Sequence, residues 1–230
     1  EVAQNIGSCK CQPSNYWLHT NMLLMNGKKM SKSDGNTISP EELFTGDSPH
    51  VSKGYSPMVV KFFMLQSHYR STLDLTDEAL LAAEKGYKRL MEAFKNLQQI
   101  TTTGINDEAP INAEIKTTIA AAYADMNDDF NTPRALSQLF ALVPTINSIV
   151  DGKIDVNAVS VETLEALKST FEVFLNDIFG LKNDLDTGGN TDLVEGLMDL
   201  IIDIRQSART NKDWTTSDQI RDKMNELNIA

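Results

Sequence analysis

From Thr76 onward, apolar residues recur every three or four positions between capping and turn residues. This spacing puts the apolar side chains on one face of a helix, which must then be buried against other helices. Thr76 itself, followed by two acids, is a typical helix start. We therefore predict a mainly α-helical bundle. Its helices are a buried one from Met58, a long one between the Thr76 cap and Thr101–Pro110, and others over Ala113–Met126, Pro133–Val150, Val161–Phe179, Thr191–Arg209 and Thr215–Leu227.

Composition limits the function classes that fit the chain. It has 230 residues and a formal net charge of −11, which argues against loose, charge-driven binding of nucleic acid but leaves room for a local basic patch. No apolar run is long enough to cross a membrane, and the sequence does not open on a signal pattern. Cys9 and Cys11 stand too close together to indicate a disulfide framework, and no second pair of soft ligands follows them. We interpret the chain as typical of a reducing cytoplasm.

The segment Lys28–Asn36 reads Lys-Lys-Met-Ser-Lys-Ser-Asp-Gly-Asn and is predicted to be an exposed loop. Before it, Asn15–Met25 is rich in aromatic and apolar residues and is predicted to be a strand. After it, a helix is predicted over Ile38–Phe44, with Ser39 as its cap and Pro40 in its first turn. Lysine ammonium groups, hydroxyls and loop amides can all bind phosphate oxygens, so this arrangement favours a polyphosphate site. The spacing of a Walker loop is absent.

Two further stretches are interpreted from their residues alone. Thr45–Pro57 is rich in Gly, Ser and Pro and is predicted to be a surface loop in which His50 is solvated. Near the C-terminal end, positive charge is concentrated beside an aromatic residue, Trp214. Such a cluster can hold unpaired bases by stacking and hydrogen bonding, or it can be an amphipathic hairpin with solvated charges and a tryptophan that anchors packing. The basic residues are Arg205, Arg209, Lys212, Arg221 and Lys223.

Several phrases of the sequence, in this order, resemble those of one protein family. Lys29-Met30-Ser31-Lys32-Ser33 is similar to the KMSKS signature of class I aminoacyl-tRNA synthetases. Glu1–Asn5 resembles the end of the zinc-binding segment of the cysteinyl-tRNA synthetases. Asp128–Pro133, reading Asp-Asp-Phe-Asn-Thr-Pro, and Ala208–Asp222, with its Lys-Asp-Trp phrase, resemble two further segments of that family. The resemblance covers nearly the whole chain, apart from a longer Thr45–Pro57 loop.

The resemblance implies a fold and an activity. Residues 1–72 would be the α/β C-terminal remnant of a Rossmann-type catalytic domain, and residues 73–230 a helical-bundle anticodon-binding domain, incomplete at its C-terminus. The full-length protein would be an ATP-dependent cysteine–tRNA ligase, which activates cysteine with ATP and transfers it to tRNA(Cys). We expect this chain, which lacks a His-x-Gly-His nucleotide motif, to be inactive alone.

The resemblance also assigns roles to single residues. Lys32 would be the main catalytic contact to the ATP phosphates, with Lys29 as a helper and Met30, Ser31 and Ser33 as further ATP-binding residues. Arg209, Trp214 and Asp218 would contact the anticodon of the tRNA. The full-length enzyme would use zinc and ATP with magnesium, and Glu1 would be one zinc ligand, with the other ligands outside this chain. Asp34 departs from the family pattern, in which an apolar residue is usual.

Three alternatives remain open at this point. A cysteine ligase of mycothiol synthesis shares the activation chemistry but reads no anticodon, and the Ala208–Asp222 phrase argues against it. Another class I synthetase should lack the Asp128–Pro133 and Lys-Asp-Trp phrases. A non-catalytic helical interaction module could carry the Lys28–Asn36 segment as a simple basic turn.

Overall fold

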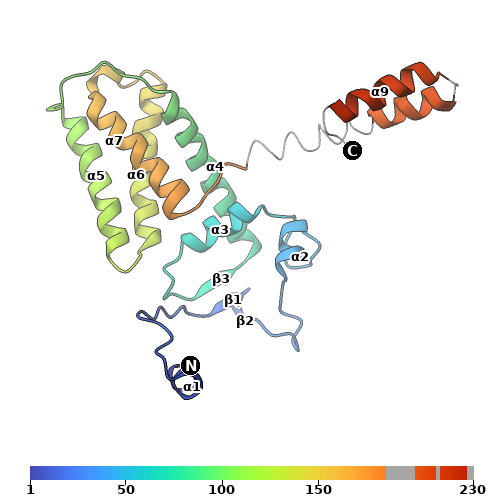
Figure 1. Ribbon diagram of the computed structural model, residues 1–230. Coiled ribbons are helices and arrows are strands. Elements are labelled where there is room, and N and C mark those ends of the chain that lie inside the picture. Colours follow the sequence, from blue (N-terminus) through green and yellow to red (C-terminus); the bar gives the residue numbers. More distant parts are fainter. Residues whose placement is uncertain (185–199, 211–212, 227–230) are drawn as a thin grey trace. The chain divides into compact units, whose positions relative to one another are not determined.

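The computed structural model describes residues 1–184, 200–210 and 213–226. The chain forms two compact units, Glu1–Lys182 and Asn183–Ala230, and each is described by itself (Figure 1). The first unit contains a small sheet and a bundle of helices, and the described part of the second unit is helical. The predicted fold class is confirmed: the chain is mainly α-helical, with a small α/β part near its N-terminus.

The first element is helix α1 (Val2–Cys9), which sequence analysis left unassigned. Lys10 follows in the left-handed conformation, with φ 54°, and this brings the Cα atoms of Cys9 and Cys11 to 5.3 Å, within the range that a disulfide requires. The structure joins the two cysteines in a disulfide bond. The expectation that these cysteines stand too close together to indicate a disulfide was therefore wrong, because it considered sequence spacing and not the turn at Lys10.

The sheet has three short strands in the order β2-β1-β3: β1 (Leu23–Met25), β2 (Lys28–Lys29) and β3 (Leu73–Leu75). β1 pairs antiparallel with β2 and parallel with β3. The predicted strand over Asn15–Met25 is wrong for its first eight residues, and the side chains of Tyr16 and Leu18 are 84% and 56% exposed. A strand requires a partner for its backbone, and within the described residues only Leu23–Met25 has one on each side.

Helices α2 (Pro40–Thr45) and α3 (Pro57–Leu65) follow the sheet's first hairpin. Ser39 caps α2 as predicted: its hydroxyl accepts a hydrogen bond from the Glu42 amide at 3.2 Å, and the Glu42 carboxylate accepts one from the Ser39 amide at 2.7 Å. α3 buries Val59, Val60, Phe62 and Phe63. α3 therefore joins the sheet region to the bundle, since it packs against α4 and α6.

The bundle contains α4 (Asp77–Gln99), α5 (Pro110–Asn127), α6 (Thr132–Val150) and α7 (Val161–Glu172), which lie side by side in Figure 1. A 3₁₀ turn, η1 (Val156–Ala158), precedes α7, and a π-helical turn, η2 (Val173–Ile178), continues it. The predicted cap Thr76 accepts a hydrogen bond from the first turn of α4, and Asn131 accepts one from the first turn of α6. The core is made of fully buried side chains from these elements and from α3, among them Phe62, Leu80, Tyr87, Leu90, Leu97, Leu139, Ile146, Leu167, Phe171 and Phe174.

A polar cluster connects the end of α3 to the turn between α5 and α6. The Asp129 carboxylate accepts hydrogen bonds from the Tyr69 hydroxyl at 2.6 Å and from the Arg70 guanidinium at 3.0 Å, and it forms an ion pair with the Arg70 Nε atom at 2.8 Å. Asp129 and Phe130 both have positive φ, 60° and 53°, which turns the chain sharply before α6. The Tyr69 hydrogen bond, followed by the Arg70 charge, lowers the pKa of Asp129. This cluster fixes the position of the sheet region on the bundle.

In the second unit, residues 200–210 are helical and α9 spans Trp214–Glu226. Asp213 caps α9, because its carboxylate accepts hydrogen bonds from the Thr216 amide at 3.2 Å and from the Thr216 hydroxyl at 2.7 Å. Ala208 and Ser217 are buried, one on each helix. Trp214 was predicted to lie in the turn, but it is the first residue of α9. The beginning of the helix predicted over Thr191–Arg209, and Lys212, lie outside the described residues.

Candidate phosphate-binding loop and nucleic-acid interface

The predicted phosphate-binding loop is carried by the hairpin of β1 and β2. Asn26 and Gly27 form its turn, with φ values of 51° and 73°, a conformation that the Asn-Gly pair favours. The Gly27 amide donates to both carboxylate oxygens of Asp74, next to β1 on β3, at 2.9 and 3.0 Å. Lys29 ends β2, so the sheet fixes the point at which the loop starts.

The loop itself closes through a small ladder. Ser31 and Asn36 exchange backbone hydrogen bonds of 3.2 and 3.1 Å, and the Gly35 amide donates to the Lys32 carbonyl at 3.3 Å. Gly35 has φ 65°, a backbone conformation that residues other than glycine rarely adopt. The Asn36 side chain donates to the carbonyls of Met25 and Lys29, both at 3.3 Å, which ties the end of the loop back to the hairpin.

Both predicted lysines are available to a ligand. Lys29 and Lys32 are exposed, and in the described part of the chain neither ammonium group has an ion pair or a hydrogen bond. The Ser31 and Ser33 hydroxyls lie 2.8 Å apart on the same turn, whereas Met30 is half-buried beneath it. The turn therefore presents ammonium and hydroxyl donors on one short segment, which is the donor set that phosphate oxygens accept.

His50 is placed differently from the prediction. It is half-buried, and its Nε2 atom lies 3.3 Å from the carbonyl oxygen of Gly35 in the loop. The expectation of a solvated side chain was wrong. The Thr45–Pro57 segment folds back toward the segment Lys28–Asn36, called the lysine loop below. The composition of Thr45–Pro57 could not reveal this long-range contact.

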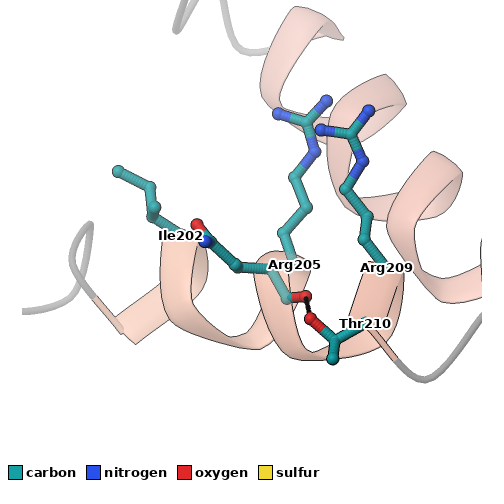
Figure 2. Close-up of a pocket in the computed structure, with 5 residues that line it drawn as sticks. Ile202, Arg205, Arg209 and Thr210 are labelled. Carbon is teal, nitrogen blue, oxygen red and sulfur yellow. Dashed lines mark hydrogen bonds between the residues drawn. The ribbon is translucent and has the colours of Figure 1, made fainter.

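The predicted nucleic-acid contacts lie on the second unit. Figure 2 shows Arg205 and Arg209 on the helical residues 200–210, with the two guanidinium groups side by side and pointing the same way. They line a cavity of about 460 Å³ together with Ile202, Gln206 and Thr210. Neither arginine has an ion pair within the described residues, and the Arg205 Nε atom is buried without a hydrogen-bond partner. Two neighbouring positive charges, with no carboxylate among the five described residues that line this cavity, suit it to an anion or to the acceptor edge of a base.

Trp214 and Asp218 lie on α9. The Trp214 side chain is 58% exposed, so it is not a buried packing anchor and its ring face can accept a base. Asp218 is exposed, and its carboxylate pairs with the Arg221 guanidinium at 2.9 Å. In the described residues no hydrogen bond or ion pair joins Arg209, Trp214 and Asp218 to one another. Arg205 was recognised only as part of the basic cluster, and its buried Nε is a signal that the sequence does not carry.

The zinc prediction finds no site in the structure. Among the described residues, no group of three or more His, Cys, Asp or Glu side chains is arranged to hold a metal ion. Glu1 is exposed, and Cys9 and Cys11 are bonded to each other. The residues present therefore do not by themselves form a zinc site, and Glu1 as a single ligand remains a prediction.

Comparison with known proteins matches two families and several relatives. Residues 1–85 match the family described as tRNA synthetases class I (C) catalytic domain, and residues 121–183 match the DALR domain. A cysteine–tRNA ligase from Parabacteroides distasonis is 43% identical over 225 residues, which is 97% of this chain and 44% of the relative. Those from Bacteroides fragilis and Moorella thermoacetica are 41% and 35% identical, over 99% and 100% of this chain and 45% and 48% of the relatives.

The chain is homologous to cysteine–tRNA ligases along nearly its whole length. It spans about half the length of the curated relatives it matches, and it corresponds to their C-terminal part. The lysine loop lies inside the match to the class I catalytic domain, whereas residues 184–230 lie outside both family matches. That last segment is therefore matched only in the alignments with whole cysteine–tRNA ligase sequences. Over the described residues, no helix is long and apolar enough to cross a membrane.

Proposed function

We propose that this chain supplies the ATP-phosphate loop and the tRNA-binding helices of a cysteine–tRNA ligase, which joins cysteine to ATP and then transfers it to tRNA(Cys). The observation that supports the first role is the exposed pair Lys29 and Lys32, which have no carboxylate partner in the described residues and lie on a turn anchored to the sheet. The place of action would be the cytoplasm.

The two lysines would act electrostatically. When the loop closes over ATP with its magnesium ion, the Lys32 ammonium group would support the negative charge that develops on the phosphates, and Lys29 would assist it. The Ser31 and Ser33 hydroxyls and the loop amides, including that of Met30, would bind the remaining phosphate oxygens. Because the lysines face solvent and are not engaged in ion pairs, no internal contact has to be broken before phosphate binds.

Calorimetric titration of ATP with magnesium into this chain tests the phosphate-binding role of the loop. A charge-assisted hydrogen bond is worth about 1.5–3 kcal/mol, so Lys32→Ala should weaken binding about tenfold to a hundredfold. Lys85→Ala removes an exposed lysine of α4 and serves as the matched control, with unchanged affinity expected. Equal affinity of the Lys32→Ala variant and the wild type would refute the role. We expect no cysteine-dependent pyrophosphate exchange from this chain alone.

The second role is recognition of the anticodon by the second unit. Arg209 could donate in pairs to a guanine edge, Asp218 could accept from an amino group, and the exposed Trp214 ring could stack on a base. Arg205, beside Arg209 in the same cavity, would add a second guanidinium (Figure 2). The domain boundary between residues 72 and 73 remains part of this proposal.

Binding of a tRNA(Cys) transcript tests the anticodon role. Arg209→Ala should weaken binding about fivefold to a hundredfold, since a good bidentate pair contributes about 1–3 kcal/mol of base discrimination. Arg89→Ala removes an exposed arginine of α4 and is the control. A transcript with an exchanged anticodon should bind wild type and Arg209→Ala equally weakly. If Arg209→Ala weakens both transcripts by the same factor, the arginine contacts the phosphate backbone and does not read the anticodon. That result would leave the mycothiol ligase and the interaction module open.

A further inference from the structure

The segment between α2 and α3 is compact rather than a free surface loop. Its two ends meet backbone to backbone, because the Tyr55 amide donates to the Leu43 carbonyl at 3.0 Å. Gly46 and Gly54 allow this approach: a Cβ on Gly46 would lie 2.3 Å from the Gly54 amide nitrogen, and one on Gly54 would lie 2.4 Å from the Phe44 carbonyl oxygen. Only glycine fits at either position without moving the backbone.

The same segment is fastened to α4. Tyr55 is 2% exposed, and its hydroxyl donates to the Asp77 carboxylate at 2.6 Å. The Ser52 amide donates to the same carboxylate oxygen at 2.9 Å. About two turns further along α4, the Glu84 carboxylate pairs with the Lys53 ammonium group at 2.6 Å. Two side chains of α4, Asp77 and Glu84, therefore hold two side chains and one backbone amide of the segment.

From this fixed segment, His50 extends to the lysine loop. Its Nε2 atom lies 3.3 Å from the Gly35 carbonyl oxygen, at the turn that closes Ser31 onto Asn36. Either the neutral ring with its proton on Nε2 or the protonated ring can donate this hydrogen bond. The contact reaches the backbone of the turn and leaves the side chain of Lys32 free.

We propose that His50 is a positioning residue for the Lys29–Ser33 loop, and that residues 46–56 connect this loop to helix α4. The functional part of the proposal rests on the phosphate role of the loop. By holding the Gly35 turn, His50 raises the fraction of molecules in which the loop has a single conformation. Apparent ATP affinity scales with the fraction that is competent to bind, so loss of the contact lowers it.

Amide hydrogen exchange of this chain, followed residue by residue by NMR without any ligand, tests the contact. The reporters are the amides of Ser31, Gly35 and Asn36, which are the hydrogen-bonded amides of the loop. His50→Ala should speed their exchange about twofold to tenfold, the range expected for loss of one neutral hydrogen bond. His50→Gln, whose side-chain amide can donate to the Gly35 carbonyl, should stay within about twofold of the wild type.

Two controls separate positioning from general loosening of the segment. His19→Ala removes an exposed histidine of the same unit and should leave the three amides unchanged. The Tyr55 amide, bonded to Leu43, should keep its wild-type rate in His50→Ala. Unchanged rates at Ser31, Gly35 and Asn36 in His50→Ala would overturn the proposal. So would an equal increase at Tyr55, since His50 would then stabilise only its own segment.

ATP titration distinguishes this proposal from the phosphate role itself. We expect His50→Ala to weaken ATP binding about twofold to tenfold, and less than Lys32→Ala does. If Lys32→Ala has no effect on ATP binding but His50→Ala still speeds exchange of the loop amides, the phosphate role fails and the positioning contact stands. If Lys32→Ala weakens binding but His50→Ala changes neither exchange nor affinity, the positioning contact fails alone.

Discussion

The hydroxyl of Tyr55 makes a short hydrogen bond whose loss can be evaluated from the structure. Tyr55→Phe keeps the buried ring and removes the hydroxyl, which donates to the Asp77 carboxylate at 2.6 Å and lies 3.3 Å from the Asp77 carbonyl oxygen. Hydrogen bonds to charged groups contribute about 1.5–3 kcal/mol, and Asp77 retains the Ser52 amide as a donor. We therefore expect the variant to lose about 2 kcal/mol of unfolding free energy at pH 7, measured by urea denaturation.

The same hydrogen bond predicts a pH dependence. Burial, followed by the hydrogen bond to Asp77, raises the pKa of Tyr55 to about 12 from its ordinary value of 10.0. A raised pKa means that the stabilisation is complete below the unfolded pKa and is lost as pH rises from about 10 toward 12. At pH 11 the unfolded phenol is ionised and the folded one is mostly protonated, so the wild type should lose about 1.4 kcal/mol that Tyr55→Phe does not lose.

An exposed tyrosine provides the control for Tyr55→Phe. Tyr16 is 84% exposed, and Tyr16→Phe should change the unfolding free energy by less than about 0.5 kcal/mol at pH 7. Equal stability of wild type and Tyr55→Phe at pH 7 would show that the bond contributes nothing. A difference between them that stays the same at pH 7 and pH 11 would contradict the raised pKa of Tyr55.

Three further perturbations test the fold. Hydrogen bonds, first of all from Lys116, lower the pKa of Asp107 to about 2. The stability that the ionised Asp107 contributes should therefore be complete above pH 4 and lost as pH falls from 4 to 2. Asp107→Asn should flatten the dependence of the urea midpoint on pH in this range. Asn112 is fully buried and makes three hydrogen bonds, so Asn112→Ala should cost about 3 kcal/mol in urea denaturation, whereas Asn127→Ala at the exposed end of α5 should cost less than about 0.5. Gly46 has φ 80° and no room for a methyl group, so Gly46→Ala should lower stability by at least about 2 kcal/mol, and an unchanged melting temperature would contradict this.

The helices could be predicted because their signals are local. Thr76 and Asn131 cap the helices that apolar periodicity placed after them, and the bounds of α6 and α9 differ from the prediction by about one residue. The helix predicted over Val161–Phe179 changes to a π-helical turn at Val173, a change of hydrogen-bonding pattern within an unbroken apolar stripe. Periodicity detects the stripe and does not distinguish the two patterns.

The errors all concern contacts between distant residues or exact turn geometry. Asn15–Met22 has strand-like composition, but whether it is a strand depends on a partner, and β3 pairs only with Leu23–Met25. The disulfide depends on the left-handed Lys10. His50 and Tyr55 make contacts 15 and 22 residues away along the chain, which no window of sequence contains. The candidate lysines were found because their motif is continuous, and their exposure followed from its polar composition.

The lysine loop and the arginine pair present their charges in different ways, and this difference bears on how each can work. Arg205 and Arg209 lie on a helix, so their spacing is set by the helical backbone before any ligand arrives (Figure 2). Lys32 lies on a turn that is held by few, exposed hydrogen bonds, and such segments open at low free-energy cost. The closure over phosphates that we propose for this loop needs that freedom, but unlimited freedom would reduce the fraction of molecules that bind ATP. His50 restricts the turn at Gly35 alone, from a segment that Asp77 and Glu84 fasten to α4. Substitutions on α4 that release this segment should therefore weaken ATP binding, although the substituted residues do not contact the nucleotide. If the loop were rigid by itself, such substitutions would leave ATP binding unchanged.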